Sequence, residues 1–181
     1  MIVLFTEEPS MKATLEALVR THFPDAVEGW HWLVIDYNGK SALEKKFPAR
    51  MRSWSFGEPL FVILRDADGA DCLQIKQRLA ALASPCGKPF KVRIVCQELE
   101  SWFIGDSEAV RRGYPHCRFT NETAKFRNPD RLTNASQELT RLTSECAKVP
   151  RAQVISQYLD PARNRSCSFQ VFFSTLRELL T

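Results

Sequence analysis

The chain of 181 residues has few glycines and no long apolar run. Its longest apolar segments, such as residues 60–64, are far shorter than the roughly 20 residues that a membrane-spanning helix needs. The first residues lack a basic segment, an apolar core and a small-residue cleavage site, so we expect no signal peptide. These absences predict a cytoplasmic protein that makes no contact with a membrane.

Zinc-binding and nucleotide-binding patterns are also missing. None of the six cysteines forms a Cys-x-x-Cys pair, and no histidine completes a zinc spacing. Because no secretory signal is present, we expect reduced thiols rather than disulfides. Gly39-Lys40-Ser41 is similar to the end of a phosphate-binding loop, but Val34 stands where that motif needs its first glycine. This argues against ATP binding there and leaves two interpretations of Lys40, a phosphate ligand or a surface lysine.

The first hundred residues alternate between short apolar strands and amphipathic helices. The expected strands span residues 2–6, 32–35, 60–64 and 92–96, and the expected helices span residues 9–23, 39–51 and 71–83. Near-continuous apolar strands separated by helices are typical of a parallel sheet that is covered on both faces. We therefore predict a Rossmann-like α/β fold, a parallel four-stranded sheet flanked by helices, with Pro48 bending or splitting the second helix.

Residues 101–181 are expected to form a mostly helical extension that packs on the 1–100 core as one compact unit. The expected helices span residues 98–104, 107–112, 130–146, 150–159 and 168–180, the last with Ser166 or Ser168 as N-cap.

Charge is unevenly placed along the chain. Residues 1–100 carry 13 basic and 13 acidic side chains, whereas residues 101–181 carry 12 basic and 8 acidic ones. This excess in the second half permits binding to nucleic acid, although an ordinary solvated surface is the alternative interpretation. The basic residues that we expect to contact nucleic acid are Lys40, Arg127, Lys148, Arg163 and Arg165.

Carboxylates gather where three of the predicted strands end. They are Glu7 after the first strand, Asp66 and Asp68 after the third, and Glu98 and Glu100 after the fourth. In a parallel sheet these endings lie along one edge, so the side chains are expected close together. Clustered carboxylates repel one another unless a cation is bound, and Mg²⁺ (or Mn²⁺) favours carboxylate oxygens. Because residues two apart face the same way in an extended chain, Asp66 and Asp68 can both point at one metal ion.

Structural interpretations of the same acids remain open. Asp and Gly after a strand are ordinary turn and capping residues, and Asp71 is expected to cap the third helix. The helix dipole favours Glu8, Glu98 and Glu100 in the first turn of a helix, whatever their function.

Two short motifs resemble the Toprim domain. Residues 5–10, Phe-Thr-Glu-Glu-Pro-Ser, are similar to its opening, in which a strand is followed by Glu-Gly-Pro-Ser or a close variant. Residues 65–68, Arg-Asp-Ala-Asp, resemble its Asp-x-Asp. Toprim domains occur in topoisomerases, bacterial primases, and nucleases of the overcoming-lysogenisation-defect and recombination-repair types. The resemblance implies general acid/base chemistry for Glu7 and Mg²⁺ binding for Asp66 and Asp68. A second glutamate replaces the usual glycine, which leaves open which of the two glutamates is functional.

A closer resemblance covers nearly the whole chain and points to domain-of-unknown-function family 4276. It is carried by Glu-Glu-Pro-Ser-Met-Lys at 7–12, Gly39-Lys40-Ser41, Asp-x-Asp-x-x-Asp-Cys at 66–72, Gln-Glu-Leu-Glu-Ser-Trp-Phe-Ile-Gly-Asp at 97–106 and Arg-Asn-Arg-Ser-Cys-Ser-Phe at 163–169. That family is bacterial and Toprim-like, and its members often lie near ATPase genes in settings of phage defence. The resemblance implies a metal-dependent hydrolase with an ATPase partner, and it favours Glu100 as a further metal ligand.

Two hypotheses of different classes follow. The first is a Mg²⁺-dependent phosphotransfer enzyme, a nuclease acting on phosphodiesters of DNA or RNA, with Glu7, Asp66 and Asp68 as catalytic residues. In it Asp66 and Asp68 hold the metal ion, and Glu7 acts as general acid/base or as a further metal ligand. The second is a non-catalytic regulatory or interaction subunit of an ATPase partner, in which these acids are structural. A homo-oligomer is compatible with both. Divalent metal bound at the acidic cluster distinguishes the first from the second.

Overall fold

The computed structural model describes residues 1–181, which form four strands, eight α-helices and two 3₁₀ helices. The strands are β1 (Ile2–Thr6), β2 (Trp32–Asp36), β3 (Leu60–Asp66) and β4 (Phe90–Val95). The α-helices are α1 (Pro9–His22), α2 (Lys40–Arg52), α3 (Cys72–Ala83), α4 (Glu100–Ile104), α5 (Ser107–Gly113), α6 (Ala135–Thr143), α7 (Lys148–Ser156) and α8 (Cys167–Leu180). The 3₁₀ helices are η1 (Ser84–Cys86) and η2 (Pro129–Arg131). No helix has the length and apolar character needed to cross a lipid bilayer.

All four strands are parallel and lie in the order β2-β1-β3-β4. In the centre, Phe5 of β1 is paired with Ile35 of β2 and Ile63 of β3. Every residue of β1 is buried, because a central parallel strand is covered on both faces. The parallel four-stranded sheet predicted from the apolar runs is therefore confirmed.

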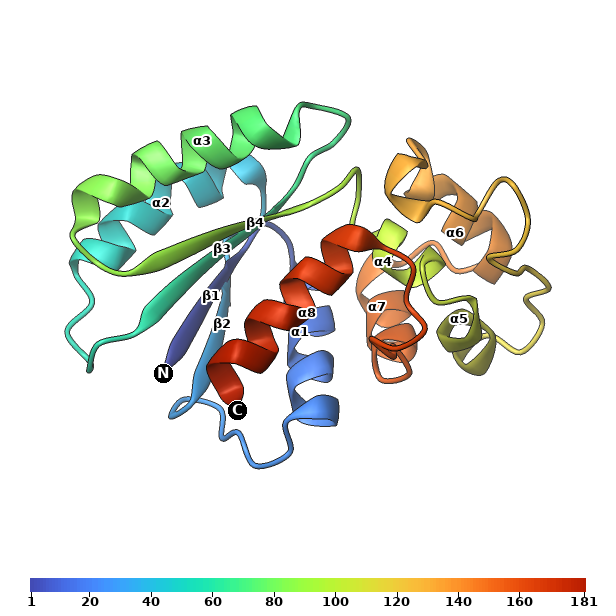
Figure 1. Cartoon of the computed structure of the whole chain (residues 1–181), viewed down its shortest axis with the longest axis horizontal. Helices are drawn as coiled ribbons and strands as arrows, with labels where there is room; N and C mark the ends of the chain where they lie inside the picture. Colours follow the sequence, from blue (N-terminus) through green and yellow to red (C-terminus); the bar gives the residue numbers. More distant parts are fainter.

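Helices cover both faces of the sheet (Figure 1). Side chains of β1 alternate between the faces, so that Ile2 and Leu4 join one apolar cluster while Val3 and Phe5 join the other. Helices α1 and α8 pack on the first face, and α2 and α3 pack on the second. The first cluster has 31 buried residues against 13 in the second, because it continues into the helical extension.

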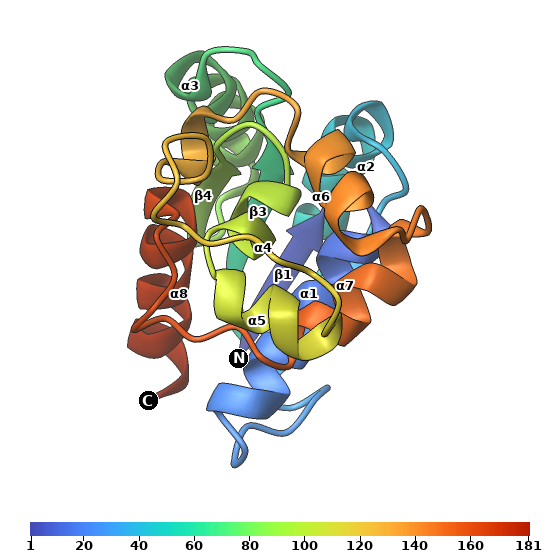
Figure 2. The same ribbon diagram turned by 90° about the vertical axis from the view of Figure 1, so that its right-hand side faces the viewer.

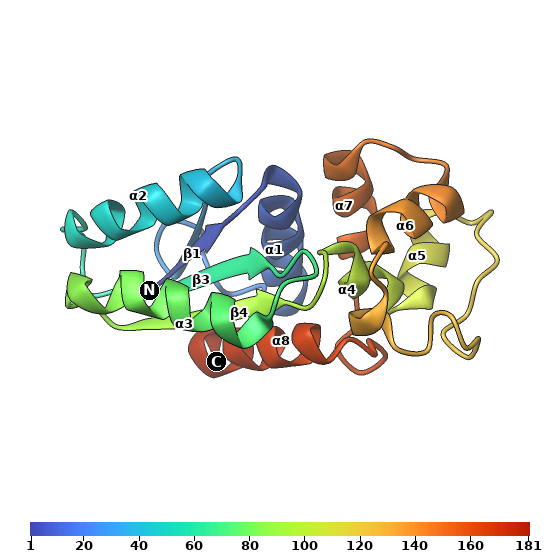
Figure 3. The ribbon, with the colours of Figure 1, turned by 90° about the horizontal axis from the view of Figure 1, so that it is seen from above.

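The helical extension, which comprises α4 to α7 and their loops, lies beyond the carboxyl ends of the strands (Figures 2 and 3). Helix α7 packs against α1. Helix α8 then returns to the sheet, where Arg93 of β4 donates to Thr175 at 2.8 Å and Lys91 pairs with Glu178 at 2.6 Å. The carboxyl edge of the sheet therefore faces helices from the second half of the chain.

One local prediction in the first half differs from the structure. Pro48 does not split α2, which runs unbroken from Lys40 to Arg52 with Pro48 buried and the neighbouring Phe47 packed in the apolar cluster of this face. Leu73, an apolar residue of the first turn of α3, is 69% exposed. The contact of α3 with the sheet is made instead by Ile75 and Leu79.

The predicted helix over 130–146 is shorter than expected. The structure has η2 first and then α6, which ends where Ser144 adopts a left-handed conformation with φ of 58°. Both capping predictions are confirmed. The Asp71 side chain accepts hydrogen bonds from two backbone N–H groups of α3, and the Ser166 hydroxyl accepts one from Phe169 at the start of α8.

Candidate active site at the carboxyl ends of the strands

Asp66, the last residue of β3, is 7% exposed. Its Oδ2 accepts a hydrogen bond from the backbone N–H of Leu99 at 3.1 Å, which ties the end of β3 to the loop before α4. Its Oδ1 is buried and has no hydrogen-bond partner. Leaving a buried carboxylate oxygen unpaired is costly, so this position calls for a proton or a cation.

Glu7 directly follows β1 and is flanked by charged groups of β3, of the turn after β3 and of α2. Its Oε2 lies 3.7 Å from Nε of Arg65 and accepts no hydrogen bond. Lys40, at the start of α2, places its Nζ 3.1 Å from Oδ2 of Asp68. Because β1 lies between β2 and β3, this ion pair spans the end of β1 beside Glu7.

Glu100, in the first turn of α4, is 2% exposed. Its Oε1 accepts hydrogen bonds from Arg151 at 2.8 Å and from the Ser136 hydroxyl at 3.2 Å, while its Oε2 has no partner. Lys148, on the same helix as Arg151, lies 3.9 Å from Glu100 and 3.4 Å from Glu8. Helix α7 therefore brings two cations to the acidic edge of the sheet.

The clustered acids shift one another's pKa values. Burial raises the pKa of Glu7, and the Asp68 carboxylate raises it further. The pKa of Asp66 lies well above its ordinary range, mainly because of burial and then because Glu8 and Glu7 add negative charge. Burial opposes the charge of Lys148, but the carboxylates of Glu100 and Glu8 outweigh it, so the pKa of Lys148 is raised. The edge thus has a negative potential that a bound cation would relieve.

The Asp-x-Asp segment does not have the geometry expected from an extended chain. The strand ends at Asp66, and Asp68 lies in the left-handed region with φ of 50°. The N–H of Asp68 donates to Gln97, and that of Ala70 donates to Ala67, so the chain turns at once. The extended conformation, in which residues two apart face the same way, therefore ends at Asp66 and does not include Asp68. No three Asp, Glu, His or Cys side chains converge as a preformed metal centre.

The residues nevertheless fit a hard divalent cation. Glu7, Asp66 and Glu100 each keep one buried carboxylate oxygen without a hydrogen-bond partner. Mg²⁺ commonly takes only one or two protein carboxylates and retains waters for substrate phosphates, so a complete protein cage is not required.

The structure brings two of the five predicted nucleic-acid-binding residues to this edge, Lys40 and Lys148. The other three lie in the helical extension and interact with neighbouring groups there. Arg163 and Arg165 form ion pairs with acidic residues of the extension, and Arg127 donates to a backbone carbonyl of its own loop.

Two charged residues of the site, Arg65 and Glu44, escape prediction from the sequence. Arg65 is 5% exposed and pairs with Glu44 of α2, which also accepts from Arg78 of α3 at 2.7 Å. The one available signal is that Arg65 occupies an inward position of β3, two residues after Ile63, and a buried arginine needs an acidic partner. The contact of Glu8 with α7 has no such signal.

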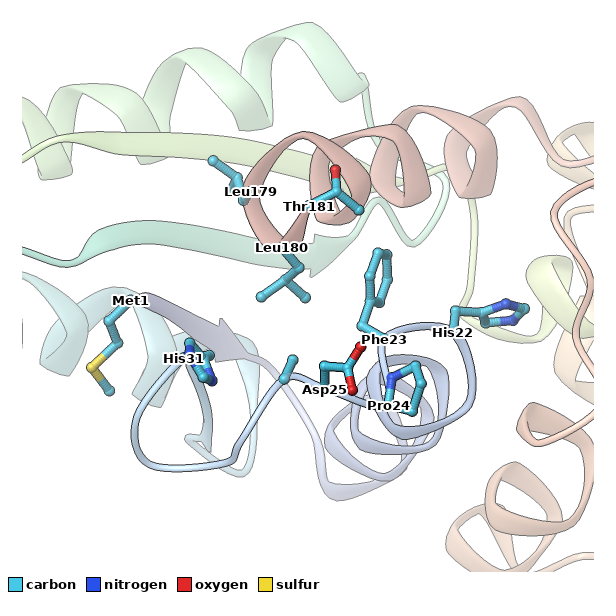
Figure 4. A pocket seen from close by; sticks show the side chains of 10 residues that line it. Met1, His22, Phe23, Pro24, Asp25, His31, Leu179, Leu180 and Thr181 are labelled. Carbon is cyan, nitrogen blue, oxygen red and sulfur yellow. The ribbon is translucent and has the colours of Figure 1, made fainter.

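A hollow between the end of α1 and the end of α8 lies away from these acids. It has a volume of about 480 Å³ and is lined by apolar side chains together with His22 and His31 (Figure 4). Both imidazoles already interact with the backbone, His22 with the carbonyl of Leu159 at 2.9 Å and His31 with the N–H of Val27 at 2.8 Å. The buried acids with unpartnered oxygens lie instead at the carboxyl edge, where parallel α/β sheets usually bind their ligands.

Comparison with known proteins identifies one family and one similar fold. The family model described as "Domain of unknown function (DUF4276)" matches residues 6–177. The solved structure of the C-terminal region of the Burkholderia pseudomallei OLD protein has a TM-score of 0.56 and 15% sequence identity, and the match covers 99% of this chain and 98% of that chain. No curated protein matches the chain. At this identity the likeness shows the fold, and the predicted Toprim-like arrangement is confirmed.

Proposed function

The chain belongs to the DUF4276 family, and on that premise we propose that it is a divalent-cation-dependent nuclease acting on phosphodiesters of DNA or RNA. The family description assigns no activity, so the proposal depends on the site. The fold shared with the OLD C-terminal region supports it, because the Toprim resemblance of Glu7, Asp66 and Asp68 extends to nucleases of the overcoming-lysogenisation-defect type.

Three unpartnered carboxylate oxygens, on Glu7, Asp66 and Glu100, carry the proposal. Acids with a purely structural role are ordinarily satisfied by hydrogen bonds. Asp71 illustrates this on the neighbouring turn, since its Oδ1 accepts from two backbone N–H groups. Buried, unsatisfied acids are instead typical of functional sites, and the raised pKa values of Glu7 and Asp66 fit this interpretation.

The acids have distinct roles in this proposal. Asp66, Asp68 and Glu100 provide carboxylate oxygens for Mg²⁺ or Mn²⁺. When bound, the cation supplies charge neutralisation at the phosphate and orients the attacking water. Glu7 holds a proton at its unpartnered Oε2 and donates it to the leaving oxygen, and the proton released by the attacking water restores the acid.

Lys40 and Lys148 provide the contacts to the phosphate. Their side chains are 55% and 45% exposed, so both reach solvent while lying beside the acids. Phosphate contacts of this kind position a strand without reading its sequence. Arg127, Arg163 and Arg165 remain predicted contacts farther from the edge.

The proposal is tested with labelled oligonucleotides in Mg²⁺ or Mn²⁺, comparing the native chain with Asp66→Asn. We expect cleavage that is abolished by a chelator and reduced at least 100-fold by the substitution, because the variant keeps the size of Asp66 but loses its charge. Asp71→Asn is the matched control, since it removes a carboxylate a few residues away and asparagine still caps a helix. Cleavage that survives Asp66→Asn, or that Asp71→Asn abolishes equally, contradicts the assignment.

A regulatory or interaction subunit of an ATPase partner is the second candidate. One observation favours it: Glu100 already pairs with Arg151 and Lys148, so the protein's own cations neutralise one predicted metal ligand. Calorimetry with Mg²⁺ separates the two. Binding that Asp66→Asn removes supports the nuclease, whereas no binding by the native chain, together with no cleavage, supports the regulatory subunit.

A further inference from the structure

Helices α2 and α3 lie side by side on one face of the sheet (Figure 3) and carry seven Lys or Arg residues but a single acid, Glu44. The seven are Lys40, Lys45, Lys46, Arg50, Arg52, Lys76 and Arg78, and all are exposed. Glu44 forms ion pairs with Arg65 and Arg78. This surface, called here the α2/α3 face, is therefore strongly positive, although residues 1–100 have no net charge.

The opposite face of the sheet has no such excess. Helices α1 and α8 together carry three Lys or Arg residues and two acids. Two of those cations, Lys12 and Arg20, both lie 3.8 Å from Glu16. An ordinary solvated surface would mix the signs on both faces, so the one-sided charge indicates a polyanionic ligand.

The positive track begins at the acidic site. Lys40, its first cation, is the residue that pairs with Asp68 beside Glu7. From there α2 runs for 13 residues, about 20 Å at 1.5 Å per residue, to Arg52. A polyanion bound along α2 would therefore have one end at the acids.

Two adjoining hollows lie toward the far end of α2 and share Arg50. One, of about 500 Å³, is also lined by Tyr37 and Lys46, and the other, of about 240 Å³, is also lined by Trp54 and Phe56. The Arg50 guanidinium lies over the Trp54 ring, 5.7 Å from its centroid. Cations and aromatic rings thus alternate along this stretch.

Two large aromatic side chains at this end face solvent. Trp30 is 66% exposed and Phe56 is 56% exposed, and their rings meet at a steep angle with centroids 6.3 Å apart. Exposed aromatic rings beside a positive groove are how proteins stack unpaired bases of a single strand. An interface with another protein would be depleted of lysine at its core, which this surface is not.

We propose that the α2/α3 face binds single-stranded nucleic acid and leads it to the acidic site. Lys45, Lys46 and Arg50 contact the phosphates, and Trp30 and Phe56 stack on unpaired bases. That this surface leads a strand to the acidic site rests on the proposed nuclease function. The affinity of the surface for nucleic acid can be measured independently of that function, because binding is assayed without cleavage. This proposal places the main contact with nucleic acid on α2, in the first half of the chain, and not on the second half, where the net positive charge lies.

The charge part is tested by fluorescence anisotropy with a labelled single-stranded oligonucleotide in chelator, over a range of salt concentrations. The triple variant Lys45→Gln/Lys46→Gln/Arg50→Gln is compared with Arg112→Gln/Arg118→Gln/Arg131→Gln, which removes three exposed cations from the helical extension. Losing three phosphate contacts should flatten the slope of log K against log salt by about 2 and weaken binding about 100-fold at 0.1 M salt. The control variant should bind like the native chain.

The aromatic part is tested with Trp30→Ala/Phe56→Ala against Leu73→Ala/Val171→Ala, which removes two other exposed apolar side chains. Losing base stacking should weaken single-strand binding about fivefold or more and leave duplex binding nearly unchanged. Circular dichroism verifies that each variant is folded.

Each other result has a definite meaning. Equal losses in both triple variants indicate an effect of overall charge, and a loss confined to the control places the strand on the helical extension; either result overturns the proposal. So does an aromatic variant that changes the oligomeric state but not the oligonucleotide affinity, since the pair then serves a contact between copies. A native chain that binds no oligonucleotide overturns both this surface and the nuclease. Binding through α2 without cleavage in Mg²⁺ or Mn²⁺ supports the surface and contradicts the nuclease alone.

Discussion

Replacing Arg151 with methionine removes a guanidinium that joins four parts of the helical extension. Arg151 is 1% exposed and donates to Oε1 of Glu100 at 2.8 Å, to the Thr140 hydroxyl at 2.6 Å and to the carbonyl of Glu145 at 2.9 Å. Methionine keeps much of the apolar stem, so packing is largely preserved. Glu100 would then be a buried carboxylate whose one remaining hydrogen-bond donor is the Ser136 hydroxyl.

Removing one partner of a buried ion pair costs about 3–5 kcal/mol, because the other charge stays buried and unpaired. In a domain of this size each kcal/mol lowers Tm by about 2–4 °C, so Arg151→Met should lower Tm by about 6–20 °C. The double variant Glu100→Gln/Arg151→Met leaves no buried charge. It should therefore recover part of the loss, with a coupling energy of about 2 kcal/mol or more between the two positions.

The assay is urea unfolding followed by circular dichroism in chelator, for the native chain, both single variants and the double variant. Lys148→Met is the matched control, because Lys148 approaches the same carboxylate but is 45% exposed, and it should cost less than about 1 kcal/mol. A loss below about 1 kcal/mol for Arg151→Met, or additive losses in the double variant, would refute the reasoning that Glu100 is a charged, buried member of the site.

Two further predictions concern titrating groups outside the site. The hydrogen bond from Lys125 is the main reason why the pKa of Glu138 lies below its ordinary value. A carboxylate whose pKa is lower in the folded chain than in the unfolded chain stabilises the fold at pH values above the unfolded pKa. This stabilisation is lost as the pH falls through the folded-state pKa. Glu138→Gln should therefore lower Tm at pH 7 but not at about pH 3, and equal losses at both would contradict this. Burial, and then a second thiol 3.8 Å away, raise the pKa of Cys96 to about 12. A thiol reagent at pH 8 should thus modify the exposed Cys146 well before Cys96, and equal rates would contradict the assignment.

The sheet and its active edge could be predicted because their signals are local. Short apolar runs at regular intervals predict buried parallel strands, and in such a sheet the residues after each strand share an edge. Glu7, Asp66 and Glu100 are placed by that rule alone. Asp71 likewise caps α3 through contacts with residues two and three positions along the chain.

The rest of the site depends on contacts between distant segments. Arg151 is 51 positions from Glu100, and nothing in either segment specifies their pairing. Asp68 leaves the extended conformation because its N–H bonds to the loop after β4, which the Asp-x-Asp spacing does not show. The positive charge of the α2/α3 face could not be predicted from the net charge of residues 1–100. A sum over residues 1–100 includes the acids of the site, which lie at the strand ends rather than on those helices.

The return of α8 to the sheet makes the helical extension an insertion that is attached to the core at both ends. A chain cut after residue 100 would lose α8 and leave α1 as the one remaining helix on the apolar face that carries Val62 and Leu64. During synthesis the acids of the sheet emerge well before Lys148 and Arg151, and domains fold as units. A partly made chain therefore carries the carboxylates without the cations that complete their surroundings, and the site is assembled only once the insertion has closed on the sheet.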